Sequence, residues 1–358
     1  MGKKVYDGTR TIFWKWGYLL NTGCANCRTT MNFYETGYLY LFHEECDIKP
    51  LREALQKNDH SYVLPYHNIE SLYEILEPYA HILVEQGWTC SISNSDKPGE
   101  YYSAEDFLNK MKYRDMIELI QKGEFVSYLQ PIMELEKYEL YAYESLLRSA
   151  DPSRKINPGQ LFKAAELTGF HSMLDQRARK TAIESRVGNI EKGVKSFINF
   201  LPSTIYNPEY CLKHTFQIVD KYGVNPEDLV FEVIETEKIE DVSHLKSVLE
   251  VYKREGMKVA LDDVGSGFAT IEMLSLLQPD IVKIDRSYIS GCDRDTDKQQ
   301  FLKTVIQTAR ELGISVLAEG IERKEELAFC KEVGVNYGQG YLIGKPALVP
   351  EKPLISAL

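Results

Sequence analysis

Two neighbouring carboxylates, Asp262 and Asp263, end an apolar segment in the motif LDDVGSG at 261–267. Adjacent like charges repel each other in a compact site, so a positive partner has to neutralise them. Gly265 and Gly267 follow and would let the chain turn sharply and bring its backbone close to a ligand. The motif is therefore a candidate chemical site.

Polar side chains also end most other apolar segments after about residue 125. They are Glu144 in YESLLR, Asn199 in FINF, Glu232 in VFEVIE, Lys283 and Asp285 in IVKID, Glu319 and Glu322 in VLAEGIE, and Gln339 in YGQG. One acidic residue after a strand is commonly a helix cap or a surface charge, but its repetition at nearly every strand indicates a shared site.

The candidate ligands are all oxygen donors, which suits magnesium, manganese or calcium and disfavours zinc. The candidate carboxylates number five: Glu144, Glu232, Asp262, Asp263 and Glu319. Five carboxylates exceed what one divalent ion usually takes, so two metal ions are favoured. Two ions about 3.5–4 Å apart can activate water and stabilise a leaving oxygen in phosphodiester cleavage.

Two cations accompany the carboxylates. Lys283 either forms simple salt bridges or, beside two metals, orients the attacking water or contacts a phosphate. Arg148 follows Glu144 on the same segment, and its planar guanidinium suits a phosphate oxygen.

The elements that carry these residues alternate between strand and helix. Strands are expected at 125–132, 140–147, 197–201, 229–234, 258–261, 281–284, 315–318 and 336–343, and helices at 160–169, 174–185, 245–256, 301–313 and 324–334. This α/β pattern predicts a parallel sheet with helices outside, and its size matches a (β/α)8 TIM-like barrel. A doubly wound open sheet is the alternative.

A different region precedes the barrel. Residues 1–100 predict a small mixed α/β accessory domain, with strands at 37–42, 61–66 and 88–93 and helices at 48–58 and 71–87. A polar turn segment at 93–100 leads to a linker helix at 101–122, and the barrel is assigned to 123–358.

Composition excludes several classes of partner. The net charge of −11 argues against binding long nucleic acid or an anionic membrane, and no segment approaches the ~18 apolar residues of a spanning helix. Seven cysteines, an odd number, favour a reducing cytosol over a disulfide framework. We therefore expect a cytoplasmic protein.

Four residues near the N-terminus have the spacing of a structural zinc site: Cys24, Cys27, His43 and Cys46. The alternatives are buried or surface thiols and a redox pair.

The ordered motifs QPI, YESLLR, FINF, FEVIE, LDDVGSG, IVKID, LAEGIE and YGQGYLIGKP, over about residues 115–350, resemble the EAL-type cyclic di-GMP phosphodiesterases. The resemblance implies a barrel that binds cyclic di-GMP over two Mg²⁺ or Mn²⁺ ions, hydrolyses this bacterial second messenger to linear pGpG, and forms a homodimer through the barrel.

By matching position, the resemblance also implies residue roles. Glu144, Asn199, Glu232 and Asp262 would hold one metal, and Asp262, Asp263 and Glu319 the other. Lys283 would position the water, with Glu319 and Asp263 as further catalytic groups and Glu319 a candidate general base. Arg148, Gln130, Asp175 and Gln339 would contact substrate, with Asp175 facing a guanine, while Glu235, Glu322 and Asp285 would support the site and its loop.

This chain departs from the family pattern at five positions. The signature EAL reads ESL, with Ser145 for Ala; Leu201 replaces Ser, Ile234 replaces Thr, Val264 replaces Phe and Ser266 replaces Thr. None removes a metal-binding oxygen. A catalytically weak cyclic di-GMP receptor signalling through the N-terminal domain is the alternative function, and an unrelated magnesium-dependent barrel enzyme is the third.

Overall fold

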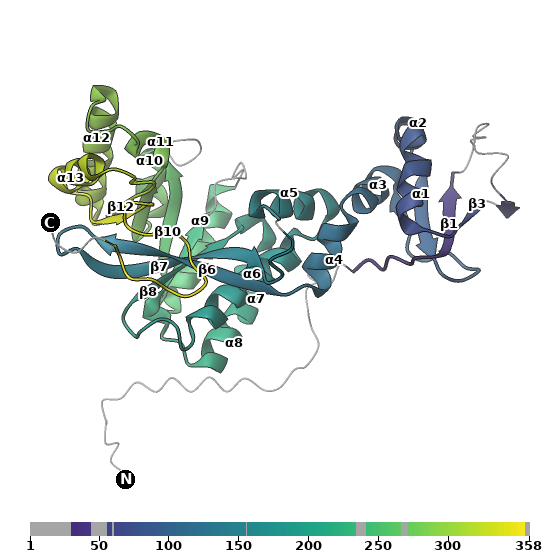
Figure 1. Cartoon of the computed structure of the whole chain (residues 1–358), viewed down its shortest axis with the longest axis horizontal. Coiled ribbons are helices and arrows are strands. Elements are labelled where there is room, and N and C mark those ends of the chain that lie inside the picture. The colour runs from purple at the N-terminus through teal and green to yellow at the C-terminus, as the bar shows by residue number, and fades with distance from the viewer. Residues whose placement is uncertain are drawn as a thin grey trace, which may run out of the picture.

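The computed structural model describes residues 30–43, 56–58, 61–154, 156–233, 241–265 and 271–354. Figure 1 shows a small N-terminal unit at one end of the molecule, a barrel at the other end and helices between them. Within the described ranges, every helix is too short or too polar to cross a bilayer.

The N-terminal unit is a five-stranded sheet in the order β2-β3-β1-β4-β5. Its elements are β1 (Gly37–Phe42), β2 (Gln56–Asn58), β3 (Ser61–Tyr66), α1 (Ile69–Leu76), a 3-10 turn η3 (Glu77–Tyr79), α2 (Ala80–Glu85), β4 (Thr89–Ser93) and β5 (Tyr102–Ser103). The expected strands at 37–42, 61–66 and 88–93 are confirmed, and the helix at 71–87 is divided by η3, which contains Pro78. The helix expected at 48–58 is wrong for 56–58, which pair with β3; the rest lies outside the described residues.

The expected linker helix is two helices, α3 (Ala104–Lys112) and α4 (Arg114–Lys122), with a break at Tyr113. Ser103 caps α3 by accepting a hydrogen bond from the Asp106 amide, as its spacing predicts. Both helices are amphipathic and bury one face. Their apolar residues join one core that continues from the N-terminal sheet into the barrel helices α5 (Pro158–Thr168) and α6 (His171–Arg186). The linker is therefore packed on both sides.

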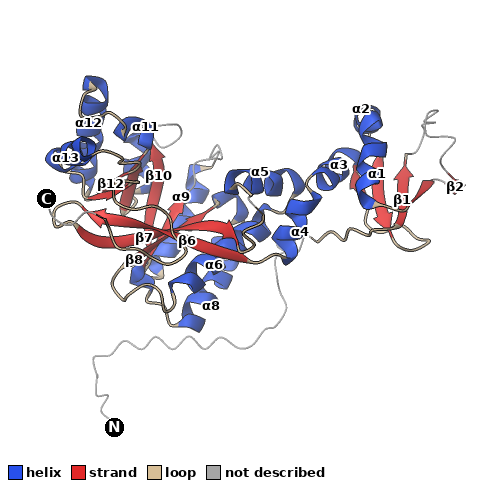
Figure 2. Ribbon diagram, viewed as in Figure 1, coloured by secondary structure: helices blue, strands red, loops and turns tan. Residues whose placement is uncertain are grey.

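The second region forms a closed eight-stranded barrel. Figure 2 draws its strands in red and the surrounding helices in blue. Its strands are β6 (Phe125–Glu134), β7 (Glu139–Ser149), β8 (Lys195–Phe200), β9 (Leu229–Val233), β10 (Lys258–Val264), β11 (Ile281–Ile284), β12 (Ser315–Ala318) and β13 (Tyr337–Gln339). The sheet order is β10-β11-β12-β13-β6-β7-β8-β9. A closed barrel replaces the open-sheet alternative.

One strand departs from the expected parallel arrangement. β6 runs antiparallel to both of its neighbours, β7 and β13. Only residues 135–138 connect β6 to β7, and a connection this short joins antiparallel strands, because parallel neighbours need a long crossover. Tyr138 adopts a positive φ of 58° in this turn.

The outer helices follow the strands. Beyond α5 and α6 they are α7 (Pro208–Cys211), α8 (Lys213–Tyr222), α9 (Val242–Arg254), α10 (Ile271–Leu277), α11 (Arg286–Ile289), α12 (Thr296–Leu312) and α13 (Lys324–Val333), with 3-10 turns η4 (Pro202–Thr204) and η5 (Pro226–Asp228). Glycines in the left-handed conformation end α5, α8, α12 and α13. The ends of α5, α12 and α13 agree with those expected from the sequence, whereas no helix was expected at the position of α8.

Inside the barrel, period-two alternation along the strands creates two layers. The inner apolar layer contains Ala142, Phe197, Val230, Ala260, Ile281 and Leu317. Each of these residues precedes a polar residue by two positions: Glu144, Asn199, Glu232, Asp262, Lys283 and Glu319. Residues two apart on a strand face the same side, so the apolar layer closes the barrel directly beneath the polar groups.

A buried ion-pair network holds the opposite end of the barrel. The Asp228 carboxylate accepts hydrogen bonds from Arg186 Nη2 at 2.7 Å, Gly193 N at 3.1 Å and Lys195 Nζ at 3.1 Å. Burial by itself would raise the pKa of Asp228, but these hydrogen bonds and the positive charges outweigh it and lower the pKa. The network ties the end of α6 to the starts of β8 and β9.

Asp228→Asn should lower the free energy of unfolding by about 3–5 kcal/mol, because it leaves Arg186 buried without its counter-ion. Since the pKa of Asp228 is lowered in the folded state, this loss should be full above about pH 4 and shrink as the pH falls further. Urea unfolding of both proteins across this range measures it. The exposed pair of Glu209 and Arg254 gives the control: Glu209→Gln should leave the free energy of unfolding nearly unchanged. Equal losses in the two variants would contradict the prediction.

Candidate active site

Lys283 is the positive partner of the acidic cluster at the barrel rim. Its Nζ lies 2.5 Å from Glu232 Oε2, 2.7 Å from Glu319 Oε1, 3.0 Å from Asp262 Oδ1 and 3.9 Å from Glu144 Oε1. These residues come from β7, β9, β10, β11 and the end of β12. One ammonium faces four carboxylates, so the cluster keeps an excess of negative charge.

Burial makes this excess costly. The side chains of Lys283 and Glu232 are 1% and 0% exposed. Burial raises the pKa of Glu319 to about 8, Lys283 opposing that effect and Asp262 and Glu144 adding to it. The pKa of Glu232 is also raised, chiefly by burial. Burial opposes the charge of Lys283, but the surrounding carboxylates outweigh it and raise the lysine pKa, so Lys283 stays an ammonium.

A bulge in β10 brings the two adjacent aspartates to one site. The pairing of β10 with β11 shifts register between Leu261 and Val264, and Asp263 has a left-handed φ of 53°. Successive side chains of a regular strand point to opposite faces, and a bulge interrupts that alternation. Carboxylate oxygens of Asp262, Asp263 and Glu319 consequently lie within 4.8 Å of one another.

Two amides orient Glu144. Asn199 Nδ2 donates to Glu144 Oε1 at 3.2 Å, and Gln339 Nε2 donates to Glu144 Oε2 at 2.7 Å. With its nitrogen turned toward Glu144, each amide has its oxygen directed elsewhere. Gln339 Oε1 is buried without a hydrogen-bond partner.

These residues fit a divalent-cation centre. The donors are carboxylate and amide oxygens, which magnesium and manganese prefer. Glu232 Oε1 and Gln339 Oε1 are buried acceptors without partners, and buried acceptors of this kind are rare unless something binds them. The excess negative charge of the cluster also favours binding of a divalent cation.

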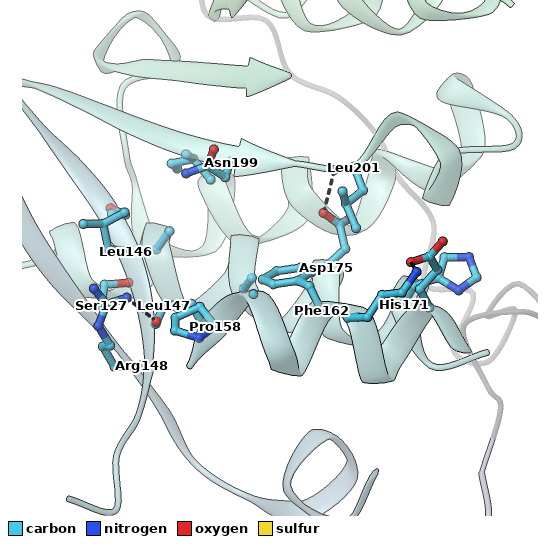
Figure 3. Close-up of a pocket in the computed structure, with 17 residues that line it drawn as sticks. Ser127, Leu146, Leu147, Arg148, Pro158, Phe162, His171, Asp175, Asn199 and Leu201 are labelled. Carbon is cyan, nitrogen blue, oxygen red and sulfur yellow. Dashed lines mark hydrogen bonds and ion pairs between the residues drawn. The ribbon is translucent and has the colours of Figure 1, made fainter. Parts of the chain in front are cut away.

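A cavity of about 430 Å³ lies beside the cluster, between β7 and helices α5 and α6. Arg148, Phe162, Asp175, Asn199 and Leu201 are among the residues on its walls, as Figure 3 shows. Asn199 belongs to both the cavity and the cluster because it lines the one and donates to Glu144 in the other. The Arg148 guanidinium donates to Leu147 O at 2.8 Å and lies over the Tyr128 ring at 5.6 Å.

Two predicted substrate contacts are engaged by protein groups. Asp175 is 1% exposed, and its carboxylate accepts hydrogen bonds from Leu201 N, Thr204 Oγ1 and the Arg179 guanidinium. It therefore ties α6 to the segment after β8. Gln130 Nε2 donates to Gly344 O at 3.1 Å. Contacts of Asp175 with a guanine and of Gln130 with substrate stay predictions.

The supporting residues have local roles. Asp285 caps α11 by accepting a hydrogen bond from Ser287 N at 2.9 Å, and Glu322 pairs with Arg286 at 2.9 Å. Gly265 has a φ of 108°, and a Cβ there would come within 2.6 Å of Tyr288 and Phe301, so the turn requires glycine.

Some predictions fall on residues that the structure does not describe. Glu235 and Gly267 lie outside the described residues, as do Cys24, Cys27 and Cys46 of the predicted zinc site. His43 is described: its Nε2 lies 2.8 Å from Gln86 O, and its ring lies 5.1 Å from that of Trp88. Zinc binding stays a prediction.

Sequence reasoning missed parts of the cavity wall. Phe162 and His171 line the cavity from helices α5 and α6. The sequence pattern of these segments predicts helices but does not indicate that they contact a ligand. Ser145 also lines the cavity, and its replacement of alanine in the ESL motif was the only signal.

A closed barrel with an acidic rim defines the class of β/α-barrel proteins whose sites lie at the strand ends. Residues 113–346 match the EAL domain family. The chain therefore belongs to the EAL domain family.

A known protein is similar to this chain over a stretch of comparable length. The probable cyclic di-GMP phosphodiesterase PdeG of Escherichia coli K12 is 31% identical over 234 residues, which cover 63% of this chain and 45% of PdeG. This chain thus matches less than half of that relative's length.

Solved structures superpose as well. A standalone versatile EAL protein from Vibrio cholerae O395, in its c-di-GMP bound form, is 32% identical with a TM-score of 0.58, covering 63% of this chain and 93% of that chain. The manganese and cyclic di-GMP complex of Klebsiella pneumoniae BlrP1 is 20% identical with a TM-score of 0.56, covering 87% of this chain and 96% of that chain. The latter likeness shows the fold alone.

Lys283→Gln should lower the free energy of unfolding in chelator by about 3–5 kcal/mol, because the buried carboxylates lose their counter-ion. Urea unfolding measures this loss. The exposed Lys180–Glu184 pair supplies the control, since Lys180→Gln should cost under about 1 kcal/mol. A Lys283 variant as stable as the Lys180 variant would show that the cluster does not depend on the lysine.

Proposed function

We propose that this chain hydrolyses cyclic di-GMP to linear pGpG with the help of two divalent cations. The observation that carries the proposal is that four carboxylates surround one buried lysine beside a cavity lined by Arg148. A fifth carboxylate, that of Asp263, lies within 4.8 Å of those of Asp262 and Glu319. Membership in the EAL domain family and the 31% identity to a probable cyclic di-GMP phosphodiesterase support it.

The chain offers ligands for two Mg²⁺ or Mn²⁺ ions that share Asp262. Glu144, Asn199, Glu232 and Asp262 would hold one, and Asp262, Asp263 and Glu319 the other. When bound, such ions lower the pKa of water and polarise phosphate oxygens. The bulge at Asp263 fits this arrangement, since it turns both aspartates toward Glu319.

The remaining site residues would position substrate and water. Carboxylates hold Lys283 at the centre of the cluster. With divalent cations bound to those carboxylates, the Lys283 ammonium would be available to orient the attacking water. Glu319 lies 2.7 Å from Lys283 Nζ and borders the same position, so it is the candidate proton acceptor. Arg148 at the cavity wall would bind a phosphate oxygen through its guanidinium.

The proposal includes a cytoplasmic location in a bacterial cell and a homodimer through the barrel. The four described cysteines, Cys90, Cys211, Cys292 and Cys330, are buried free thiols, which is typical of proteins in a reducing compartment.

Purified protein incubated with cyclic di-GMP should yield pGpG in Mg²⁺ or Mn²⁺ and none in chelator. Glu144→Ala should lower the rate by at least about 100-fold, because it removes an oxygen ligand that two amides orient. Glu139→Ala provides the matched control, since Glu139 is an exposed glutamate on the same strand. Chromatographic separation of products measures both rates. Absence of pGpG with either metal would defeat the proposal.

A second candidate is a receptor that binds the dinucleotide and signals through the N-terminal unit. One continuous apolar core favours it. This core contains Trp88 directly before β4, Phe107 in α3, Ile120 in α4, Leu161 in α5 and Leu174 in α6. Helices α5 and α6 also line the cavity. A ligand bound between β7 and these two helices would therefore contact helices that belong to the same apolar core as the N-terminal unit.

Binding of cyclic di-GMP in chelator should slow amide hydrogen exchange in α3 and α4, because a ligand that stabilises α5 and α6 also stabilises helices packed in the same core. Helix α12 packs in the barrel core, which α6 joins only through Ala182 and Ile183 near its end, so it serves as the internal control, with a smaller change expected. Mass spectrometry of the exchanged peptides reports both regions. Unchanged exchange in α3 and α4 would argue against coupling.

A further inference from the structure

Ser145 stands out on the cavity wall because its hydroxyl has no partner. The residue is 7% exposed, and its Oγ is buried without a hydrogen bond. Leaving a buried hydroxyl unsatisfied costs free energy, so native structures rarely do so without a functional reason. The EAL signature carries alanine at this position, which would fill the space without that cost.

Strand geometry directs Ser145 toward the cavity. On β7, Glu144 points into the barrel toward Lys283, so the next side chain points outward, toward the helices. Ser145 lies opposite Ile198 of β8 in the sheet register, and both residues line the cavity. The serine side chain therefore lies at the wall between the metal ligands and helices α5 and α6. Its Oγ is covered in the ligand-free chain, so a rotation about χ1 to another staggered position has to turn the hydroxyl toward a ligand.

The cavity around Ser145 combines apolar walls with polar atoms that lack hydrogen-bond partners. Its walls include the apolar side chains of Leu147, Phe162, Ala182 and Ile198. A second polar atom without a partner, His171 Nδ1, belongs to another residue of the same wall. Pockets of this size with apolar walls and a few polar groups are typical of small-molecule sites.

We propose that Ser145 is a substrate-binding residue whose hydroxyl forms a hydrogen bond with one guanine base of cyclic di-GMP. Guanine carries both acceptors and donors on its edge, and a serine hydroxyl can donate or accept. The inference rests on the proposed function, since it takes cyclic di-GMP as the ligand. It adds a contact that alanine at this position cannot make.

The test compares Ser145→Ala with the unchanged protein. The Kd for cyclic di-GMP, measured by calorimetry in chelator, should rise about 3- to 10-fold, the loss expected for one neutral hydrogen bond. In Mg²⁺ the KM should rise by a similar factor while kcat changes less than about twofold. The thermal unfolding midpoint of the ligand-free variant should not fall, because the substitution removes an unsatisfied hydroxyl.

Ser91 gives the matched control. It lies on β4 of the N-terminal sheet, is fully buried, and also has an Oγ without a partner. Ser91→Ala should leave Kd and KM unchanged. If Ser145 had only a packing role, Ser145→Ala would change the stability of the protein and leave the Kd for cyclic di-GMP unchanged.

The outcomes separate this inference from the proposed function. Hydrolysis by the unchanged protein, with equal Kd in Ser145→Ala, would overturn the role of Ser145 and leave the enzyme proposal standing. Binding without hydrolysis, with weaker binding by Ser145→Ala, would overturn the enzyme proposal and support the role of Ser145. A protein that does not bind cyclic di-GMP would overturn both.

Discussion

The attraction between one buried ammonium and a ring of carboxylates is the interaction on which the site depends. Lys283 lies within 3.0 Å of oxygens from Glu232, Glu319 and Asp262. Removed from water, these acids could not all remain charged without a cation among them. A single lysine neutralises part of the charge. The remaining imbalance explains why the rim suits divalent cations and why burial and neighbouring acids raise the pKa of Glu319.

The barrel makes this concentration of charge possible. Apolar side chains such as Phe197 and Val230 close the interior just below the acids, so the polar layer rests on a rigid base. The bulge at Asp263 then adds a carboxylate that regular strand alternation would have placed on the outside. The site therefore combines regular strand periodicity with one local departure from it.

The N-terminal unit and the cavity share a physical connection. Helices α3 and α4 bury their apolar faces in a core that also holds α5 and α6, and α5 and α6 form a wall of the cavity. A change in packing around the cavity therefore alters the packing of the N-terminal unit, because protein interiors are close-packed. Enzyme and receptor functions would use the same connection, and they differ in whether the bound dinucleotide is cut.

The sequence alone was enough to predict a barrel, with an open sheet as the alternative, the positions of most strands and the acidic residues that gather at the strand ends, because apolar periodicity and residues at strand ends are local patterns. Tertiary structure decided the rest. Asp175, for example, accepts hydrogen bonds from Leu201 N and Thr204 Oγ1, and Gln130 donates to Gly344 O. The orientation of Ser145 likewise depends on α5 and α6, which lie elsewhere in the chain. Such features depend on partners distant in sequence, and no local pattern records which segments will meet.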